Sequence, residues 1–297
     1  MSTALPGDLE LELLARENVP LGPLTTLGVG GPAPWVLEPR RREQLILAVR
    51  ELHAAGMEWR VLGHGSNLLV RDAGVPEVVL HTRSLRHIYH EGEREHALRC
   101  EAGAPLSRLV TMAREQGLAG AEMLVGIPGT VGGAVIGNSG SRHGWISELL
   151  VEVTVVDVDG CARAVPVTPE DFGYRSSPFA GQVVVDAVVQ LKPEPPAVIR
   201  ARTEEILRAK AASQPLAARS AGCMFRNPPG QASGQLLDAL GCKGWSEGPA
   251  EVSERHANFV VNRGGARADE VLALIERVRA AVRAEHQVEL ELEVEIW

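Results

Sequence analysis

The sequence has few aromatic residues, no excess of positive charge and no long apolar run. Aromatic residues make up 4% of the 297 positions, while a content of 45% hydrophobic and 23% charged residues is ordinary for a soluble globular protein. The formal net charge of −8 argues against nucleic acid or an anionic membrane as the main partner, because both need clustered positive charge. No stretch approaches the length of a membrane span, so we expect no membrane partner.

Cysteine is also scarce, and it occurs only at Cys100, Cys161, Cys223 and Cys242. These positions form no C-x-x-C pair, so the sequence predicts neither a bound metal nor a redox dithiol. The N-terminus carries Asp8, Glu10 and Glu12 among leucines, and it lacks the basic and continuous apolar regions of a secretory signal. A reduced, cytoplasmic protein is the simplest interpretation.

Helical and strand-like patterns are interleaved along a chain long enough for two or three domains. Apolar spacing predicts helices over 41–53, 106–113, 198–210 and 271–282. Valine-rich or alternating runs predict strands at 59–62, 151–158, 161–167, 183–191 and 288–296. The turn pair Asp159-Gly160 joins two of these strands as a hairpin, so α+β is the predicted fold class. The prolines of KPEPP, 192–196, predict a domain boundary.

Two glycine-rich segments stand out. The first, GHGSNLLV at 63–70, follows a predicted strand and suits either a phosphate cradle or a plain tight turn. It lacks the third glycine of the dinucleotide-binding fingerprint and the lysine of a P-loop. The second, GIPGTVGGAVIGNSG at 126–140, is so rich in glycine that it predicts no regular helix. It indicates close passage of the chain past a bulky planar ligand or against another domain.

The segment AGCMFRNP, 221–228, combines a thiol, a guanidinium and a carboxamide in Cys223, Arg226 and Asn227. A proton donor, an anion binder and a hydrogen-bonding group within one short turn are typical of a site. By residue type alone, the pair Tyr174-Arg175 is most simply a surface pair. The glutamates at 289, 291, 293 and 295 form what is ordinarily a solvated strand face.

In this order, the segments resemble those of the UDP-N-acetylenolpyruvoylglucosamine reductases, flavoenzymes of peptidoglycan precursor synthesis, from Thr25 to Glu293. Cys223 stands where most members carry serine. The chain resembles the shorter subtype, because it has no mid-chain gating loop with a tyrosine. The resemblance implies a two-part FAD-binding region of the vanillyl-alcohol-oxidase (PCMH) type at 1–80 and 81–196, a substrate-binding domain at 197–286 and a terminal strand at 287–297.

The resemblance also implies roles for single residues. Cys223 would donate the final proton, Arg175 would stabilise negative charge on the substrate, and Glu293 would be the catalytic glutamate, with Glu291 or Glu295 named instead by a register slip of two. Contacts to non-covalently bound FAD would come from Gly63, His64, Gly65, Ser66, Asn67, Leu68, Ile127, Pro128, Gly129, Thr130, Gly132, Gly133 and Asn138. Substrate contacts would come from Tyr174, Arg226, Asn227, Lys243, His256 and Asn258. For His256, a structural or surface histidine is the alternative.

The implied reaction is the reduction of a UDP-sugar, UDP-N-acetylglucosamine enolpyruvate, to UDP-N-acetylmuramic acid, with NADPH as hydride donor and ping-pong turnover. An FAD-dependent alcohol oxidase of the same flavin-binding superfamily is the alternative enzyme, and it would not need the AGCMFRNP and HANF segments. A nucleotide-sugar-binding protein without flavin is the non-catalytic alternative.

Overall fold

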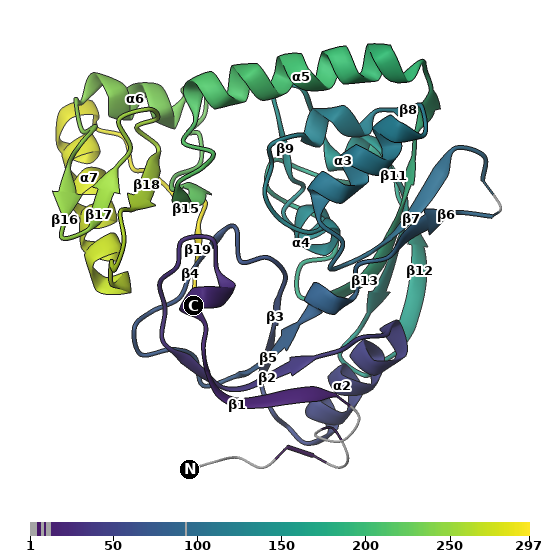
Figure 1. Ribbon diagram of the computed structural model, residues 1–297. Helices are drawn as coiled ribbons and strands as arrows, with labels where there is room; N and C mark the ends of the chain where they lie inside the picture. Colours follow the sequence, from purple (N-terminus) through teal and green to yellow (C-terminus); the bar gives the residue numbers. More distant parts are fainter. Residues whose placement is uncertain (1–4, 7–8, 10–12, 93) are drawn as a thin grey trace. The chain divides into compact units, whose positions relative to one another are not determined.

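The computed structural model describes residues 5–6, 9, 13–92 and 94–297, and the chain divides into two compact units (Figure 1). The first unit comprises Met1–Glu17, Trp35–His64 and Glu77–Ala209, and the second comprises Asn18–Pro34, Gly65–Pro76 and Lys210–Trp297. The acidic residues Asp8, Glu10 and Glu12 lie outside the described residues. Each unit is therefore assembled from separate stretches of sequence.

A four-stranded sheet with the order β1-β2-β5-β3 belongs largely to the first unit, and β5 pairs in parallel with both β2 and β3. Helix α2 packs on this sheet, because Leu45, Val49 and Leu52 repeat at helical spacing and share a buried core with Leu37 and Leu80 (Figure 1). The elements are β1 (Leu14–Pro20), β2 (Pro32–Glu38), α2 (Arg42–Ala54), β3 (Trp59–Leu62), β5 (Val78–His81) and the 3-10 turn η2 (Thr82–Ser84). The helix and strand predicted at 41–53 and 59–62 are confirmed.

An antiparallel five-stranded sheet with the order β12-β11-β13-β7-β6 forms the rest of the first unit's framework. Helix α3 covers it, with Leu109 packed in the same core as Leu98 and Val153. The elements are β6 (Ile88–His90), β7 (Ala97–Glu101), α3 (Leu106–Glu115), β11 (Leu150–Val156), β12 (Ala162–Pro166) and β13 (Val183–Gln190). The predicted hairpin is confirmed, and Gly160 in its turn has φ +77°.

The glycine-rich segment at 126–140 contains a short helix, α4 (Val131–Ile136), so the prediction of no regular helix there is wrong. The Gly132 N–H donates to the Ala102 carbonyl at 2.8 Å, and a Cβ on Gly132 would lie 2.9 Å from the Ala102 Cβ. Thr130 caps the helix by accepting a hydrogen bond from the Gly133 N–H at 3.5 Å. Close packing and this cap outweigh the low helix propensity of glycine.

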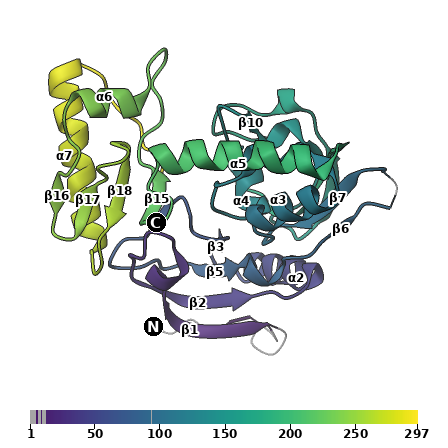
Figure 2. The ribbon, with the colours of Figure 1, turned by 45° about the horizontal axis from the view of Figure 1, so that its top comes forward.

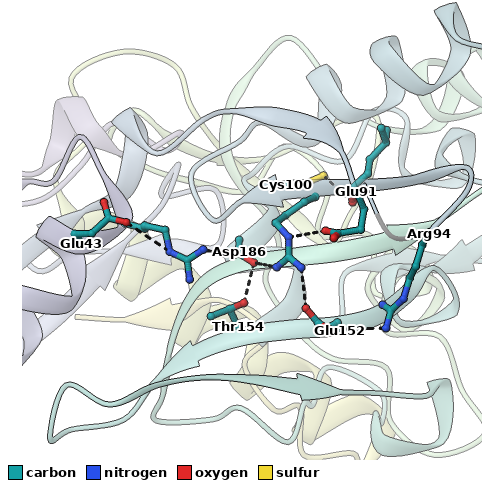
Figure 3. Close-up of polar contacts among 10 residues, drawn as sticks. Glu43, Glu91, Arg94, Cys100, Glu152, Thr154 and Asp186 are labelled. Atoms are coloured by element: carbon teal, nitrogen blue, oxygen red, sulfur yellow. Dashed lines mark hydrogen bonds and ion pairs between the residues drawn. The ribbon is translucent and has the colours of Figure 1, made fainter.

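Arg99 of β7 forms ion pairs with three carboxylates, those of Glu91, Glu152 and Asp186, which are labelled in Figure 3. Its guanidinium donates to Glu91, Glu152 and Asp186 over distances of 2.7, 2.8 and 2.6 Å. Burial opposes the charge on Arg99, but these hydrogen bonds outweigh burial and raise the pKa of Arg99. The buried Asp186 also lies 3.4 Å from Arg42, so the network ties helix α2 to the five-stranded sheet.

One long helix, several short strands and three 3-10 turns complete the description of the first unit. Helix α5 (Pro196–Ser213) begins at the last proline of KPEPP and confirms the helix predicted at 198–210; Figure 2 shows it as one unbroken helix. The other elements are β8 (Leu118–Ala119), η3 (Ala121–Leu124), β9 (Gly140–Ser141), β10 (Gly144–Trp145), η4 (Ile146–Glu148), η5 (Pro169–Asp171) and β14 (Lys192–Pro193). The predicted domain boundaries after residues 80, 196 and 286 stay predictions, and α5 belongs to the first unit as far as Ala209.

The second unit contains an antiparallel sheet with the order β15-β18-β17-β16. Helix α7 packs on it, with Leu274 and Val278 in the same core as Val252 and Val260, which confirms the helix predicted at 271–282. The elements are η1 (Gly22–Leu24), β4 (Leu68–Leu69), β15 (Arg219–Cys223), α6 (Ser233–Ala239), β16 (Ser246–Glu247), β17 (Ala250–Val252), β18 (Phe259–Asn262), α7 (Ala268–His286) and β19 (Glu295–Ile296). Among the described residues, no helix is both long and apolar enough to cross a bilayer.

The continuous strand predicted at 288–296 is wrong in extent. Only β19 is a strand there, and it pairs in parallel with β4, while Leu292 forms an isolated bridge with Phe225. The segment changes its partner midway, because the Glu293 N–H donates to Met224 and the Glu295 N–H donates to Asn67. A change of partner interrupts a regular ladder even where the apolar alternation continues. The mixture of hairpins and helices confirms the α+β class.

Candidate active site

The first glycine loop begins where β3 ends, in the first unit. The Thr82 hydroxyl donates to the Leu62 carbonyl at 3.3 Å, and buried His81 lies opposite Leu62 in the parallel pairing. A Cβ on Gly63 would lie only 2.7 Å from the hydroxyl of Thr130, the cap of α4. The fold thus requires glycine at position 63, and it brings together predicted cofactor residues from both glycine segments.

The loop continues in the second unit from Gly65. Gly65 has φ +60°, and its carbonyl accepts hydrogen bonds from the Thr26 N–H at 3.1 Å and the Thr26 hydroxyl at 3.3 Å. The C=O and N–H of a trans peptide point in opposite directions, so the Ser66 N–H is turned away from Thr26. Exposed His64 precedes this turn, and buried Leu68 follows it in β4.

Glu293 lies between this loop and the segment that carries Cys223. The Asn67 amide donates to the Glu293 carbonyl at 2.9 Å, and the Glu293 N–H donates to the Met224 carbonyl at 2.7 Å. The second unit therefore brings the predicted Asn67, Cys223 and Glu293 onto adjoining backbone segments.

Burial distinguishes Glu293 from the other glutamates near the C-terminus. Glu293 is half-buried, whereas Glu289, Glu291 and Glu295 are exposed. The Glu295 carboxylate also accepts a hydrogen bond from the Trp297 indole at 2.8 Å. Glu293, the residue that the family resemblance selects, thus differs from the other three in burial, and its catalytic role stays a prediction.

A bulge in β15 sets the position of Cys223. The pairing of β15 with β18 shifts register between Ser220 and Cys223, and Gly222 at the bulge has φ +79°. Bulges re-aim side chains at strand ends and are frequent at sites. The Cys223 thiol is half-buried and forms no disulfide.

Asn258, a predicted substrate residue, fixes the backbone of the segment after Cys223. It is buried, and its side chain accepts from the Phe225 N–H at 3.0 Å and donates to the Phe225 carbonyl and the Ser233 hydroxyl, both at 2.8 Å. Ser233 also donates to the Asn227 side chain at 3.0 Å. Sequence reasoning missed Ser233, because no motif marks a buried serine at the start of a helix. Direct substrate contacts of Asn227 and Asn258 stay predictions.

The remaining predicted substrate residues of the second unit differ in their surroundings. Arg226 is half-buried, and its Nε has no hydrogen-bond partner among the described residues. Lys243 pairs with Asp238 at 2.6 Å. Burial lowers the pKa of His256, as does the nearby Lys243 charge, and the His256 ring accepts a hydrogen bond from the Asn258 N–H at 3.2 Å. His256 therefore has a structural role, and its contact with substrate stays a prediction.

In the first unit, Tyr174 and Arg175 form the tip of a tight hairpin. Gly173 and Ser176 exchange backbone hydrogen bonds of 3.1 and 3.2 Å across it. The buried Asn138 amide donates to the Gly173 carbonyl at 3.0 Å, so Asn138 links the second glycine segment to this hairpin. A flavin contact by Asn138 stays a prediction.

The second glycine loop presents its backbone just before α4. Gly129 has φ +128°, and its carbonyl accepts from the Leu106 N–H at 3.1 Å. Ile127 packs partly on the core, and Pro128 is exposed. Neither 63–70 nor 126–140 contains an acidic residue or a cysteine. The residues present therefore fit FAD: a diphosphate would meet loop amides without a repelling carboxylate, and no thiol is available in either loop for covalent attachment.

Comparisons with known proteins define the class first. A family model described as "FAD binding domain" matches residues 33–165, which places the chain among flavin-binding proteins. A model described as "UDP-N-acetylenolpyruvoylglucosamine reductase, C-terminal domain" matches residues 214–297.

Individual relatives then define the family. The UDP-N-acetylenolpyruvoylglucosamine reductase of Moorella thermoacetica is 42% identical over 99% of this chain and 98% of its own length. That of Synechococcus sp. strain JA-3-3Ab is 40% identical over 95% of this chain and 90% of its own. The crystal structure of the Thermus caldophilus reductase has a TM-score of 0.81 and 40% identity, and the match covers 96% of this chain and 98% of that one. The chain belongs to the UDP-N-acetylenolpyruvoylglucosamine reductase family, as the sequence motifs predicted.

Proposed function

We propose that this chain is an FAD-dependent oxidoreductase that reduces UDP-N-acetylglucosamine enolpyruvate to UDP-N-acetylmuramate with NADPH, in the cytoplasm, for peptidoglycan precursor synthesis. The proposal rests on identity of about 40% to reductases of that name over nearly the whole chain. The local geometry supports it, since Cys223 and Glu293 lie on adjoining backbone segments. The alcohol oxidase is disfavoured, because it accounts for neither the match over 214–297 nor that geometry.

FAD would be held by the glycine loops at 63–70 and 126–140, and it would supply hydride transfer from NADPH to the vinyl carbon of the substrate. Negative charge would then develop on the carbon that bears the carboxylate. Arg175 would stabilise this charge through its planar guanidinium. Arg226, with an unpaired buried Nε, would bind an anionic part of the UDP-sugar.

Cys223 would complete the reaction by donating a proton from its thiol. A free cysteine thiol has a pKa of about 8.5, so it is a better general acid than the alcohol of serine. Glu293 would assist through a hydrogen bond or in its protonated form, because a bare carboxylate would repel the developing charge.

The visible spectrum of the purified protein tests this function. Under anaerobic conditions, NADPH should bleach the flavin bands, and the enolpyruvyl substrate should then restore them. Restoration by oxygen alone would favour an oxidase. A colourless protein that cannot be reconstituted with FAD would contradict both enzymes and favour a nucleotide-sugar-binding protein. Acid precipitation should release the yellow cofactor, and colour retained in the pellet would point to covalent attachment at His64.

The role of Arg175 is tested by the two half-reactions. Arg175→Lys should leave flavin reduction by NADPH nearly unchanged and slow reoxidation by the enolpyruvyl substrate by about 10- to 100-fold, because lysine keeps the charge but lacks the planar donors. Stopped-flow absorbance separates the two steps. Equal slowing of both would assign Arg175 to flavin or nucleotide binding.

A further inference from the structure

Trp145 contacts both Tyr174 and Arg175 of the hairpin, and the sequence motifs assign it no role. It ends β10, where it pairs with Gly140 of β9. A Cβ on Gly140 would lie 2.5 Å from the indole ring. Glycine at 140 therefore allows the indole to lie directly against the backbone, which fixes one side of the ring.

The other surroundings of Trp145 are Tyr174 and Arg175. The Trp145 and Tyr174 rings are nearly perpendicular, at 89°, with centroids 5.8 Å apart. The guanidinium carbon of Arg175 lies 5.4 Å from the Trp145 centroid and 5.4 Å from the Tyr174 centroid. Both distances are within the range of cation–π attraction, and the edge-to-face rings support each other.

The backbone shows that this arrangement is held in place. Arg175 has φ +53°, a left-handed conformation that side-chain-bearing residues rarely adopt and that persists only where the surroundings impose it. The backbone hydrogen bonds between Gly173 and Ser176 close the turn that contains Arg175. Buried Asn138 links this turn to the segment just after Trp145, because its amide N–H donates to the Gly173 carbonyl at 3.0 Å and its carbonyl accepts from the Ser147 N–H at 3.3 Å.

We propose that Trp145 is a positioning residue that selects the working orientation of the Arg175 guanidinium. A free arginine side chain samples many rotamers, and two perpendicular ring faces restrict it to few. The inference rests on the function proposed for Arg175, which is to stabilise charge on the substrate. It adds that the orientation of Arg175 is prepared before substrate binds.

The first test distinguishes the effect of an aromatic ring at position 145 from the effect of side-chain size. Trp145→Leu removes the ring face, and Trp145→Phe keeps a smaller one. We expect Trp145→Leu to slow flavin reoxidation by the enolpyruvyl substrate about 3- to 30-fold, and Trp145→Phe to recover most of that loss. Flavin reduction by NADPH should stay at the wild-type rate in both. Equal slowing of both half-reactions, or no rescue by phenylalanine, would overturn the proposal.

The second test is coupling between Trp145 and Arg175. In an Arg175→Lys background, Trp145→Leu should have little further effect, because the group that it positions has gone. Slowing by the same factor in both backgrounds would overturn the proposal.

A third measurement needs no turnover. In a double-mutant cycle of thermal midpoints of the holoenzyme, with Trp145→Leu and Arg175→Leu, the combined shift should be smaller than the two single shifts together. Additive shifts would overturn the cation–π contact itself. Coupled shifts combined with a wild-type reoxidation rate for Arg175→Lys would instead overturn the function proposed for Arg175.

Arg277→Leu is the matched control. Arg277 lies over Trp245 with its guanidinium carbon 4.5 Å from the ring centroid, a pair of the same kind in the second unit. No catalytic or binding role is assigned to Arg277. Its loss should leave both half-reactions at wild-type rates, and slowing as large as that of Trp145→Leu would overturn the specific role of Trp145.

Discussion

The two units hold their proposed catalytic side chains by different means. In the first unit, Arg175 at the tip of a two-residue hairpin contacts two aromatic rings with its guanidinium group. In the second unit, Cys223 leads into a backbone segment that buried Asn258 and Ser233 hold by hydrogen bonds. One unit orients the side chain itself, and the other orients the main chain beneath it.

The difference follows from side-chain length. A thiol is one bond from Cβ, so a fixed backbone leaves it only a choice among three staggered rotamers. A guanidinium is separated from its backbone by several rotatable bonds, so it needs contacts along its length as well. We therefore expect that loss of the hydrogen-bonding side chains around Cys223 will disturb the second unit's site. Loss of the aromatic rings around Arg175 should disturb the first unit's site.

The largest effect is expected at Cys223. Cys223→Ala removes a positioned general acid, which typically costs about 10²- to 10⁴-fold, so flavin reoxidation by substrate should slow by that factor while reduction by NADPH is spared. Cys223→Ser should retain much of the activity. Stopped-flow absorbance measures both steps, and near-wild-type reoxidation in the alanine variant would mean that the proton comes from elsewhere.

Alkylation of the Cys223 thiol provides a second test of its role. Cys161 is exposed and should be replaced by serine first, whereas burial raises the pKa of Cys100 to about 12 and of Cys242 to about 11, which makes both poor nucleophiles. In the Cys161→Ser protein, iodoacetamide should inactivate the enzyme, and bound substrate should protect it. Full activity after modification of Cys223 would contradict the assignment.

A smaller effect, on stability, is expected at Asn258. Asn258→Ala leaves the buried Phe225 N–H without its Asn258 partner and leaves the Phe225 carbonyl only the longer hydrogen bond from Ser233, so the free energy of unfolding should fall by about 2–4 kcal/mol. Urea denaturation of the holoenzyme measures this fall. Asn227→Ala is the comparison, because Asn227 is exposed and its loss should cost about 1 kcal/mol. Equal losses of unfolding free energy in the two variants would show that burial of a hydrogen bond does not increase its contribution to stability here.

The smallest effect is a pH dependence set by His81 in the first unit. Burial, with a smaller contribution from the nearby Arg83 charge, lowers the pKa of His81 to about 4. Between pH 6.5 and 4 the unfolded chain binds a proton that the folded unit does not, so stability is full above pH 6.5 and falls as the pH falls. His81 alone should account for about 2 kcal/mol between pH 7.5 and 5.

His81→Gln removes that titration and should flatten the pH dependence of unfolding by the same amount, provided that FAD is kept in excess. Exposed His90 provides the control, since His90→Gln should leave the slope unchanged. An unchanged slope in His81→Gln would mean that the imidazole is solvated in the folded protein.

Periodic patterns revealed much of the fold, and distant contacts account for most of what they missed. Helix α2 and the Asp159-Gly160 hairpin follow from apolar spacing and turn chemistry, which are local. Helix α4 does not, because its stability depends on packing against Ala102. The Tyr174-Arg175 tip has none of the asparagine or glycine expected at φ +53°.

The residues of the site also divide into those that sequence motifs identify and those whose contacts appear only in the folded protein. Family motifs named Cys223 and Glu293, but no spacing rule could reveal that Asn258 and Ser233 share a hydrogen bond, because they lie 25 residues apart. The position of Trp145 over Arg175 depends likewise on two hairpins brought together by Asn138. Such contacts exist only once the chain has folded.

The scattered make-up of the second unit has a consequence for synthesis. Its core includes Leu27 and Val29 from near the start of the chain together with Leu290 and Val294 from its last eight positions. On the ribosome, Leu27 and Val29 must wait until residues 290–294 have been made before that core can close. A nascent chain would therefore expose these leucines and valines during synthesis of the intervening residues, and chaperones that bind such apolar segments would find them available during that time.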